Sequence, residues 1–231
     1  MSPAIGIGIG TCFGGGAPAK WTPKLLAPTQ WLRSDLGVTL AGSDVAAWAD
    51  QSGNGYGVSN SADRPSYDTS GSIPKLVFDG VTERLYRPAL PTPSAYTYSM
   101  VFKATRDGND IIADSDGSLG WSIAAGSATE FYCFHSGGGK SRKVANTATF
   151  TNCDVQWDGA NLRARINGGS WSTVSGATSL PSVSSNFSIG AYFNGAYPTP
   201  MELWEFVYWG SVVSDPNLAK LRAYMLARYG V

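Results

Sequence analysis

The sequence of 231 residues contains little cysteine, little histidine and little charge. Its three cysteines, Cys12, Cys133 and Cys153, include no C-x-x-C pair, which excludes the zinc and redox motifs built on that spacing. An odd number leaves at least one thiol free or paired between chains. Cys133 and Cys153 could form a cross-strand disulfide, or they could be small buried apolar residues, as suits a protein made in a reducing cytoplasm.

Charged residues make up only 15% of the chain, and 17 basic side chains are balanced by 17 acidic ones. Without a basic stripe to neutralise phosphates, electrostatic binding of nucleic acid is not expected. No segment approaches the ~20 continuous apolar residues of a membrane span. The N-terminus also lacks the basic and apolar regions of a secretory signal, so we expect no membrane partner.

Aromatic residues, glycine and proline are abundant. Aromatic residues make up 12% of the chain, which also has 28 glycines and 13 prolines, so the sequence predicts a sizeable core and many turns. Apolar residues at Tyr96, Tyr98, Met100 and Phe102 alternate with Thr97, Ser99, Val101 and Lys103, which predicts a strand with one buried and one more exposed face. Similar runs recur, and they predict an antiparallel sandwich or barrel.

Turn signals and one helical pattern complete this outline. Asp158-Gly159 and Asn167-Gly168-Gly169 follow alternating runs and predict hairpins. Near the end, Ser214-Asp215-Pro216 supplies an N-cap and an early proline, and residues 216–229 are predicted to form a helix that packs on the sandwich. Gly230 suits its C-terminal cap.

The sequence of the N-terminal region predicts an extended docking arm over residues 1–24. It alternates isoleucine with glycine at Ile5, Gly6, Ile7, Gly8, Ile9 and Gly10. Such a strand is weak alone and gains order by adding to the edge of another sheet, where main-chain hydrogen bonds supply the affinity. We therefore expect this arm to dock on another subunit, with a disordered leader as the alternative.

The order of motifs carries a family resemblance over roughly Pro28 to Val231. T-Q-W-L-R-S-D-L-G-V is followed by W-A-D-Q-S-G-N-G, P-K-L-V-F-D-G, S-M-V-F-K-A, F-S-I-G-A, E-L-W-E-F-V-Y-W and L-A-K-L-R-A-Y-M-L-A-R-Y-G. This order resembles the concanavalin A-like, laminin G-like jelly-roll family in the form common in bacteriophage and bacterial proteins. The resemblance implies an all-β, two-sheet antiparallel jelly-roll sandwich over residues 25–231. It also implies roles as carbohydrate-binding modules, adhesion domains or virion appendages, with some relatives acting as glycoside hydrolases.

Two of these motifs are interpreted as structural corners. Trp48 and Phe78 are expected to anchor loops in the core, whereas the polar and glycine residues that accompany them turn the chain: Asp50, Ser52, Gly53, Asp79 and Gly80. A calcium site at Asp50 and Asn54 would need six to eight oxygen ligands, and the loop offers too few, so no metal or other cofactor is expected.

No catalytic set is recognisable. Glu202 and Glu205 are the nearest candidates for the paired carboxylates of a glycosidase, but three residues apart on a strand they should point to opposite faces unless a bulge intervenes. The lone His135 has no evident nucleophile beside it. We therefore expect a protein that is not an enzyme.

Aromatic residues in one loop form the candidate ligand site. Tyr192, Phe193, Asn194 and Tyr197 lie close together in sequence, and Trp171 and Trp121 could add platforms for sugar rings. The alternatives are that these side chains close the ends of the sandwich or form a protein interface.

The sequence thus favours a non-enzymatic virion structural protein, made in the host cytoplasm and carried as a decoration, fibre or tail-associated domain. It would dock on other virion proteins through the arm, and it is expected to be a homo-oligomer. The alternative is an adhesin that binds a host-surface glycan, and a third hypothesis is a glycoside hydrolase.

Overall fold

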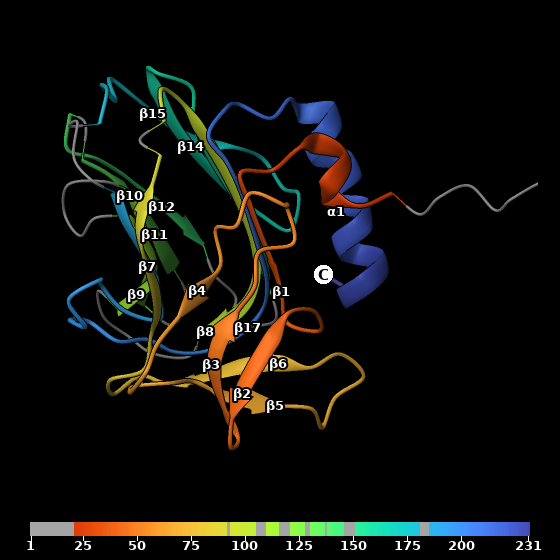
Figure 1. The fold of residues 1–231 in the computed structure, drawn as a ribbon. Helices are drawn as coiled ribbons and strands as arrows, with labels where there is room; N and C mark the ends of the chain where they lie inside the picture. The colour runs from red at the N-terminus through yellow and green to blue at the C-terminus, as the bar shows by residue number, and fades with distance from the viewer. Residues whose placement is uncertain are drawn as a thin grey trace, which may run out of the picture.

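Antiparallel strands dominate the computed structural model of the chain, which describes residues 21–91, 93–104, 110–115, 121–127, 130–136, 138–145, 151–180 and 185–231. The predicted all-β sandwich with one C-terminal helix is confirmed (Figure 1). The proposed arm at Ile5 to Gly10 lies outside the described residues, so its docking stays a prediction.

One sheet, here called the helix-bearing sheet, is ordered β15-β14-β13-β8-β17, with β1 and β6 on the far edge of β17. Its strands are β1 (Gln30–Arg33), β6 (Lys75–Asp79), β8 (Tyr96–Ala104), β13 (Thr151–Trp157), β14 (Asn161–Ile166), β15 (Ser172–Ser175) and β17 (Pro200–Trp209). The hairpins predicted between β13, β14 and β15 are confirmed.

The opposite sheet is ordered β12-β11-β10-β9-β16-β7-β4-β3. Its strands are β3 (Asp44–Trp48), β4 (Val58–Ser59), β7 (Leu85–Leu90), β9 (Asp110–Ser115), β10 (Trp121–Ser127), β11 (Glu130–His135), β12 (Lys140–Ala145) and β16 (Ser185–Ile189). Strand β2 (Val38–Ala41) pairs with β3, and β5 (Ser66–Asp68) links β3 to β6, so the two sheets are joined along one side.

The sandwich core lies between the two sheets and is made of aromatic and aliphatic side chains. Phe102 on β8 meets Phe131 on β11 with ring centroids 5.7 Å apart, and Phe187 on β16 meets Phe206 on β17 at 5.2 Å. Both pairs cross from one sheet to the other. The alternating apolar residues of β8 point into this core, as the sequence pattern predicts.

The second face of β8 corrects a prediction. Thr97, Ser99 and Val101 were expected to be more exposed, yet each has 0% exposure. The reason is that α1 (Asp215–Tyr229) covers this face of the helix-bearing sheet, so that β8 is buried on both sides (Figure 1). The hydroxyl groups are paired inside the protein: Thr97 Oγ1 donates to the Ser211 carbonyl at 2.9 Å, and Ser99 Oγ to Asp154 Oδ1 at 2.7 Å.

Helix α1 packs on the sheet as predicted. Its buried residues Leu218, Leu221 and Met225 join an apolar group with sheet residues, here called the helix-side cluster, which comprises Trp31, Val101, Val207, Trp209, Val213, Leu218, Leu221, Met225 and Val231. Gly230 ends the helix in the left-handed conformation with φ of 77°. Ser214 occupies the N-cap position, although its side chain makes no capping hydrogen bond.

The buried thiols and the single imidazole sit within the sandwich. Cys133 and Cys153 are both buried and free, so no disulfide joins them. His135 has 0% exposure and both ring nitrogens are satisfied: Nε2 donates to the Thr178 carbonyl at 2.8 Å, and Nδ1 accepts from the Tyr96 hydroxyl at 3.0 Å. Desolvation lowers the pKa of this imidazole, although the hydrogen bond to Thr178 opposes the shift.

Candidate functional site

One face of α1 forms a wall of a pocket of about 800 Å³. Lys220, Tyr224 and Arg228 are spaced four residues apart and therefore lie above one another on the helix. The small residues Ala223 and Ala227 lie beside them on the same wall. This face differs from the apolar one that packs on the sheet, so the sequence of α1 serves both packing and the pocket.

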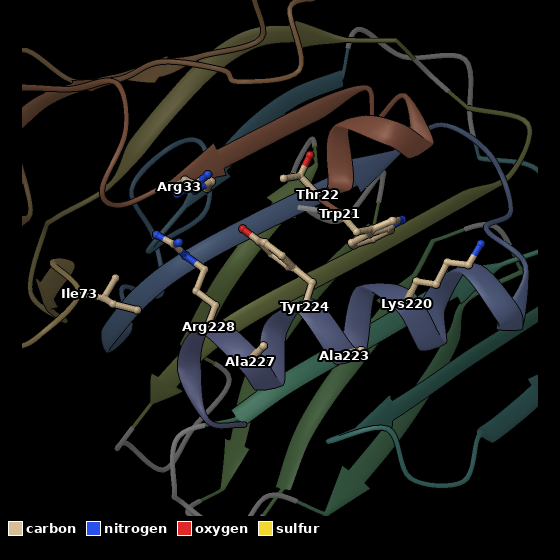
Figure 2. Close-up of a pocket in the computed structure, with 9 residues that line it drawn as sticks. All are labelled: Trp21, Thr22, Arg33, Ile73, Lys220, Ala223, Tyr224, Ala227 and Arg228. Carbon is tan, nitrogen blue, oxygen red and sulfur yellow. The ribbon is translucent and has the colours of Figure 1, made fainter. Parts of the chain in front are cut away.

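The other wall comes from the beginning of the described chain. Trp21 and Thr22 precede the short 3-10 helix η1 (Pro23–Leu26), Arg33 ends β1, and Ile73 lies in the loop before β6. Together with the α1 wall, these residues line the pocket, whose volume of about 800 Å³ is within the range of small-molecule sites. Figure 2 shows Trp21 and Tyr224 in the middle of the pocket, with basic side chains toward both ends.

An aromatic corner forms the centre of the pocket. The rings of Trp21 and Tyr224 meet edge to face, with centroids 6.0 Å apart and planes at 61°. This arrangement is a favourable one for two aromatic rings, and it holds them at an angle to each other. A ligand with an apolar face could lie against either ring.

A buried carboxylate underlies this corner. Glu205 on β17 has 0% exposure and accepts hydrogen bonds from Trp31 Nε1 at 2.6 Å, from the Tyr224 hydroxyl at 3.1 Å and from the Tyr229 hydroxyl. Burial raises the pKa of Glu205, and these hydrogen bonds oppose the shift. The carboxylate joins β1, β17 and α1, and thereby fixes the position of Tyr224.

A second acidic residue connects two of the basic ones. Asp35 pairs with Arg33 Nη2 at 2.8 Å and with Arg228 Nη2. Burial of Asp35 disfavours its charge, but hydrogen bonds from Arg33 and Arg228 outweigh this effect and lower its pKa. The third cation, Lys220, is exposed and makes no ion pair with any described residue.

A smaller pocket of about 230 Å³ adjoins the first and shares Ile73 and Arg228 with it. Its lining includes Lys75, whose ammonium lies 2.9 Å from Glu202 and 3.3 Å from Asp68. Two carboxylates therefore offset the charge of Lys75, so this end of the groove is less positive than the end near Lys220.

The candidate ligand residues of the aromatic loop are not in the lining of either pocket. Tyr192 and Tyr197 meet edge to face at 5.3 Å, and Phe193 packs on Tyr86 of β7 at the same distance. Asn194 turns its side chain onto the Ala196 amide, with 3.0 Å between the atoms. Tyr197 is the most open of these side chains, with 55% exposure, and its φ of 56° is unusual for a residue other than glycine.

Trp171 lies apart from that loop, next to α1. The guanidinium carbons of Arg163 and Arg165 are each 4.3 Å from the centroid of its ring, and its Nε1 donates to Asp215 at 3.2 Å. A sugar stacking on Trp171 would have to displace a guanidinium. The side chain of Trp121 is outside the described set.

The W-A-D-Q-S-G-N-G run is a tightly bonded corner. Trp48 is fully buried in the sandwich core. Asp50 accepts from the amides of Trp31 and Ser52, each at 2.8 Å, and from the amide of Tyr56 at 2.9 Å. Gly53 takes a φ of 101°. Both carboxylate oxygens of Asp50 thus accept hydrogen bonds from backbone amides. Among the described residues, no three His, Cys, Asp or Glu side chains are grouped so that they could hold a metal ion.

The P-K-L-V-F-D-G run forms a second corner. Phe78 is buried in the sandwich core, and Asp79 Oδ1 accepts from the Val81 amide at 2.8 Å. Gly80 has a φ of 73°, and a β-carbon there would lie 2.4 Å from Pro200 Cδ. Only glycine fits this contact without a shift of the neighbouring chain.

The expectation that Glu202 and Glu205 point to opposite faces is wrong. The register of β17 with β8 shifts between Leu203 and Glu205, so that Leu203 and Phe206 both enter the sandwich core while the two acidic residues share the helix-covered face. Even so, Glu202 is held by Lys75, and Glu205 is buried under the aromatic corner. They do not form an open pair of carboxylates.

Comparison with known proteins gives likeness in fold alone. No protein-family model and no curated protein matches the chain. The binding domain of Paraclostridial Mosquitocidal Protein 1 is similar with a TM-score of 0.63 and 11% identity, covering 86% of this chain and 52% of that one. The ligand binding domain of botulinum neurotoxin serotype D, solved with N-acetylneuraminic acid, is similar with a TM-score of 0.61 and 11% identity. The match covers 89% of this chain and 53% of that one.

The binding domain of botulinum neurotoxin DC, solved with rat synaptotagmin II, gives a TM-score of 0.62 and 12% identity, covering 86% of this chain and 52% of that one. The chain spans about half the length of these solved structures, so the molecules bound to them are not assigned to the shared half. Among the described residues, no helix is long and apolar enough to span a membrane.

Proposed function

We propose that this domain is a carbohydrate-binding module that recognises a surface glycan through the pocket beside α1. The observation that carries the proposal is the corner of Trp21 and Tyr224 with basic side chains around it. The apolar face of a sugar ring stacks on aromatic side chains, and a few polar groups then set its orientation. The pocket has both elements and a volume that admits sugar rings.

The structural neighbours support this proposal at the level of fold. Each is a binding domain, and one was solved with N-acetylneuraminic acid. This evidence supports the adhesin alternative over the virion hypothesis, since none of the three is described as a virion protein. The hydrolase hypothesis is less favoured because Glu202 and Glu205 are both engaged within the protein.

A glycan array with the purified domain tests the proposal. Trp21→Ala should abolish binding of the glycans that the natural protein binds on the array. Trp171→Ala, which removes a tryptophan outside the pocket, should leave this binding unchanged. Thermal unfolding of both variants separates loss of binding from loss of fold.

Two results would overturn the assignment. If no glycan binds, the domain does not act as a carbohydrate-binding module. If the double variant Tyr192→Ala and Tyr197→Ala loses binding while Trp21→Ala keeps it, the glycan site is the aromatic loop and not the pocket.

The virion hypothesis is a separate proposal about where the domain is carried. Its support is the alternation of isoleucine and glycine from Ile5 to Gly10, which suits docking by strand addition. Deletion of residues 1–16 should prevent incorporation into particles made in the host cytoplasm, and normal incorporation of the truncated protein would exclude docking through the arm. Sedimentation of the full chain would test the expected homo-oligomer.

A further inference from the structure

We propose that the pocket beside α1 selects a sugar that carries a carboxylate, and that Lys220 is the cation that this carboxylate meets. The inference rests on the proposed function and adds the chemical class of the ligand. It follows from how charge is distributed around the pocket and from which cations are already paired.

The lining of the pocket is basic. It includes Arg33, Lys220 and Arg228, and none of its residues is acidic. The carboxylates behind the lining are Asp35 and Glu205, and with both ionised the three cations still leave one positive charge. Glu205 accepts hydrogen bonds from Trp31, Tyr224 and Tyr229, and among the pocket's cations Arg33 acts on it electrostatically.

The three cations are not equally available. Arg33 and Arg228 share Asp35, and a ligand carboxylate approaching them would meet its negative charge as well. The groove continues past Arg228 to Lys75, where Glu202 and Asp68 add further negative charge. Three cations and three carboxylates balance at that end, so an anionic group gains less there than beside an unpaired cation.

Lys220 lies at the opposite end of the helix face. It is eight residues before Arg228, which corresponds to about 12 Å along the helix axis, with Tyr224 midway. It is exposed and forms no ion pair with described residues, so pairing with a ligand breaks no ion pair among them. A sugar ring placed on the aromatic corner can thus direct a carboxylate toward Lys220 (Figure 2).

Binding of matched acidic and neutral sugars tests the inference. N-acetylneuraminic acid is compared with its methyl ester, and glucuronic acid with glucose, by calorimetry or ligand-observed NMR. We expect at least one acid to bind about tenfold more tightly than its neutral partner, as a charge-assisted hydrogen bond provides. Which pair shows the preference distinguishes sialic acids from uronic acids as the source of the carboxylate.

Two lysine variants identify the contact. Lys220→Gln should remove the preference for the acid while the neutral partner binds as before. Lys24→Gln is the matched control, since Lys24 is an exposed lysine of η1 outside the pocket lining, and this variant should keep the preference. The preference in the natural protein should also weaken as salt concentration rises.

The failures are distinguishable. Equal affinity for the acid and neutral members of both pairs, with Trp21-dependent binding on the array, overturns this inference and leaves the proposed function standing. Retention of the preference in Lys220→Gln overturns the assignment of Lys220. Absence of any glycan binding on the array defeats the proposed function itself.

Discussion

The two faces of the helix-bearing sheet are both buried, but they are filled differently. The face toward the opposite sheet packs against rings and aliphatic chains, as in the contact of Phe206 with Phe187 at 5.2 Å. The face toward α1 also has an apolar cluster, yet it contains the hydrogen-bonded carboxylate of Glu205 and borders an open pocket. We therefore expect the first face to supply most of the stability, whereas the second combines packing with a pocket.

The largest effect is expected in the sandwich core. Phe206→Ala should lower the free energy of unfolding by about 3–5 kcal/mol, because the side chain is fully buried between Phe187 and Tyr98 and its loss leaves a cavity. Urea denaturation measures the change. A loss below about 1 kcal/mol would show that this face is not the main source of stability.

A smaller loss should follow when the carboxylate on the other face is removed. Glu205→Ala leaves the indole of Trp31 and the hydroxyls of Tyr224 and Tyr229 without their acceptor, and we expect a cost of about 3 kcal/mol. Glu205→Gln keeps one acceptor oxygen and nearly the same volume, so it should cost less. Equal stability of the alanine and natural proteins in urea would contradict the structural role of this network.

Glycan binding by Glu205→Gln and Phe206→Ala tests which face of the sheet supports the ligand site. Because the carboxylate fixes Tyr224, which lies at the centre of the pocket, its replacement should weaken glycan binding even where the fold survives. Phe206→Ala, at a temperature where it stays folded, should leave binding nearly unchanged. The opposite pattern would place the site away from α1.

The two faces should respond to pH in opposite directions. Burial lowers the pKa of His135 in the sandwich, so the unfolded chain binds the proton more readily and stability falls as pH drops below about 6.5. Burial raises the pKa of Glu205, so the folded chain holds its proton more readily and stability falls as pH rises above about 4.3.

Urea midpoints measured across pH test both assignments. His135→Gln should reduce the loss of stability below about pH 6.5, and Glu205→Gln should reduce the loss that begins above about pH 4.3, each relative to the natural protein. Profiles unchanged by these substitutions would assign the pH dependence to other groups. Glu83, whose pKa burial raises to about 7, contributes with the same sign as Glu205, so Glu83→Gln is the necessary control.

Sequence patterns predicted the scaffold because they report local alternation. Tyr96, Tyr98, Met100 and Phe102 were placed on the correct face of β8, and Gly230 on the correct end of α1. The burial of Thr97 and Ser99 was missed because a polar residue in an alternating strand indicates exposure only when nothing covers that face. Here the cover is a helix more than 100 residues later in the chain.

The candidate pocket was less accessible to sequence reasoning. The spacing of Lys220, Tyr224 and Arg228 on one helix face is visible in the sequence, although it is equally typical of a solvated helix surface. Trp21 and Arg33 come to line the same pocket as these helix residues only because β1 pairs with β17 along the sheet edge. The irregular register near Trp204, which turns Glu205 toward α1, has no local signal such as a glycine.

The smallest effect is expected on the outer surface of α1, where a substitution contacts neither face of the sheet. Leu226 is 53% exposed, whereas Met225 beside it is fully buried in the helix-side cluster. Leu226→Ala should change the free energy of unfolding by less than about 0.5 kcal/mol, and Met225→Ala should cost about 2–4 kcal/mol. Similar losses in both variants would mean that the outer surface of α1 is covered by another chain, which would itself support the expected homo-oligomer.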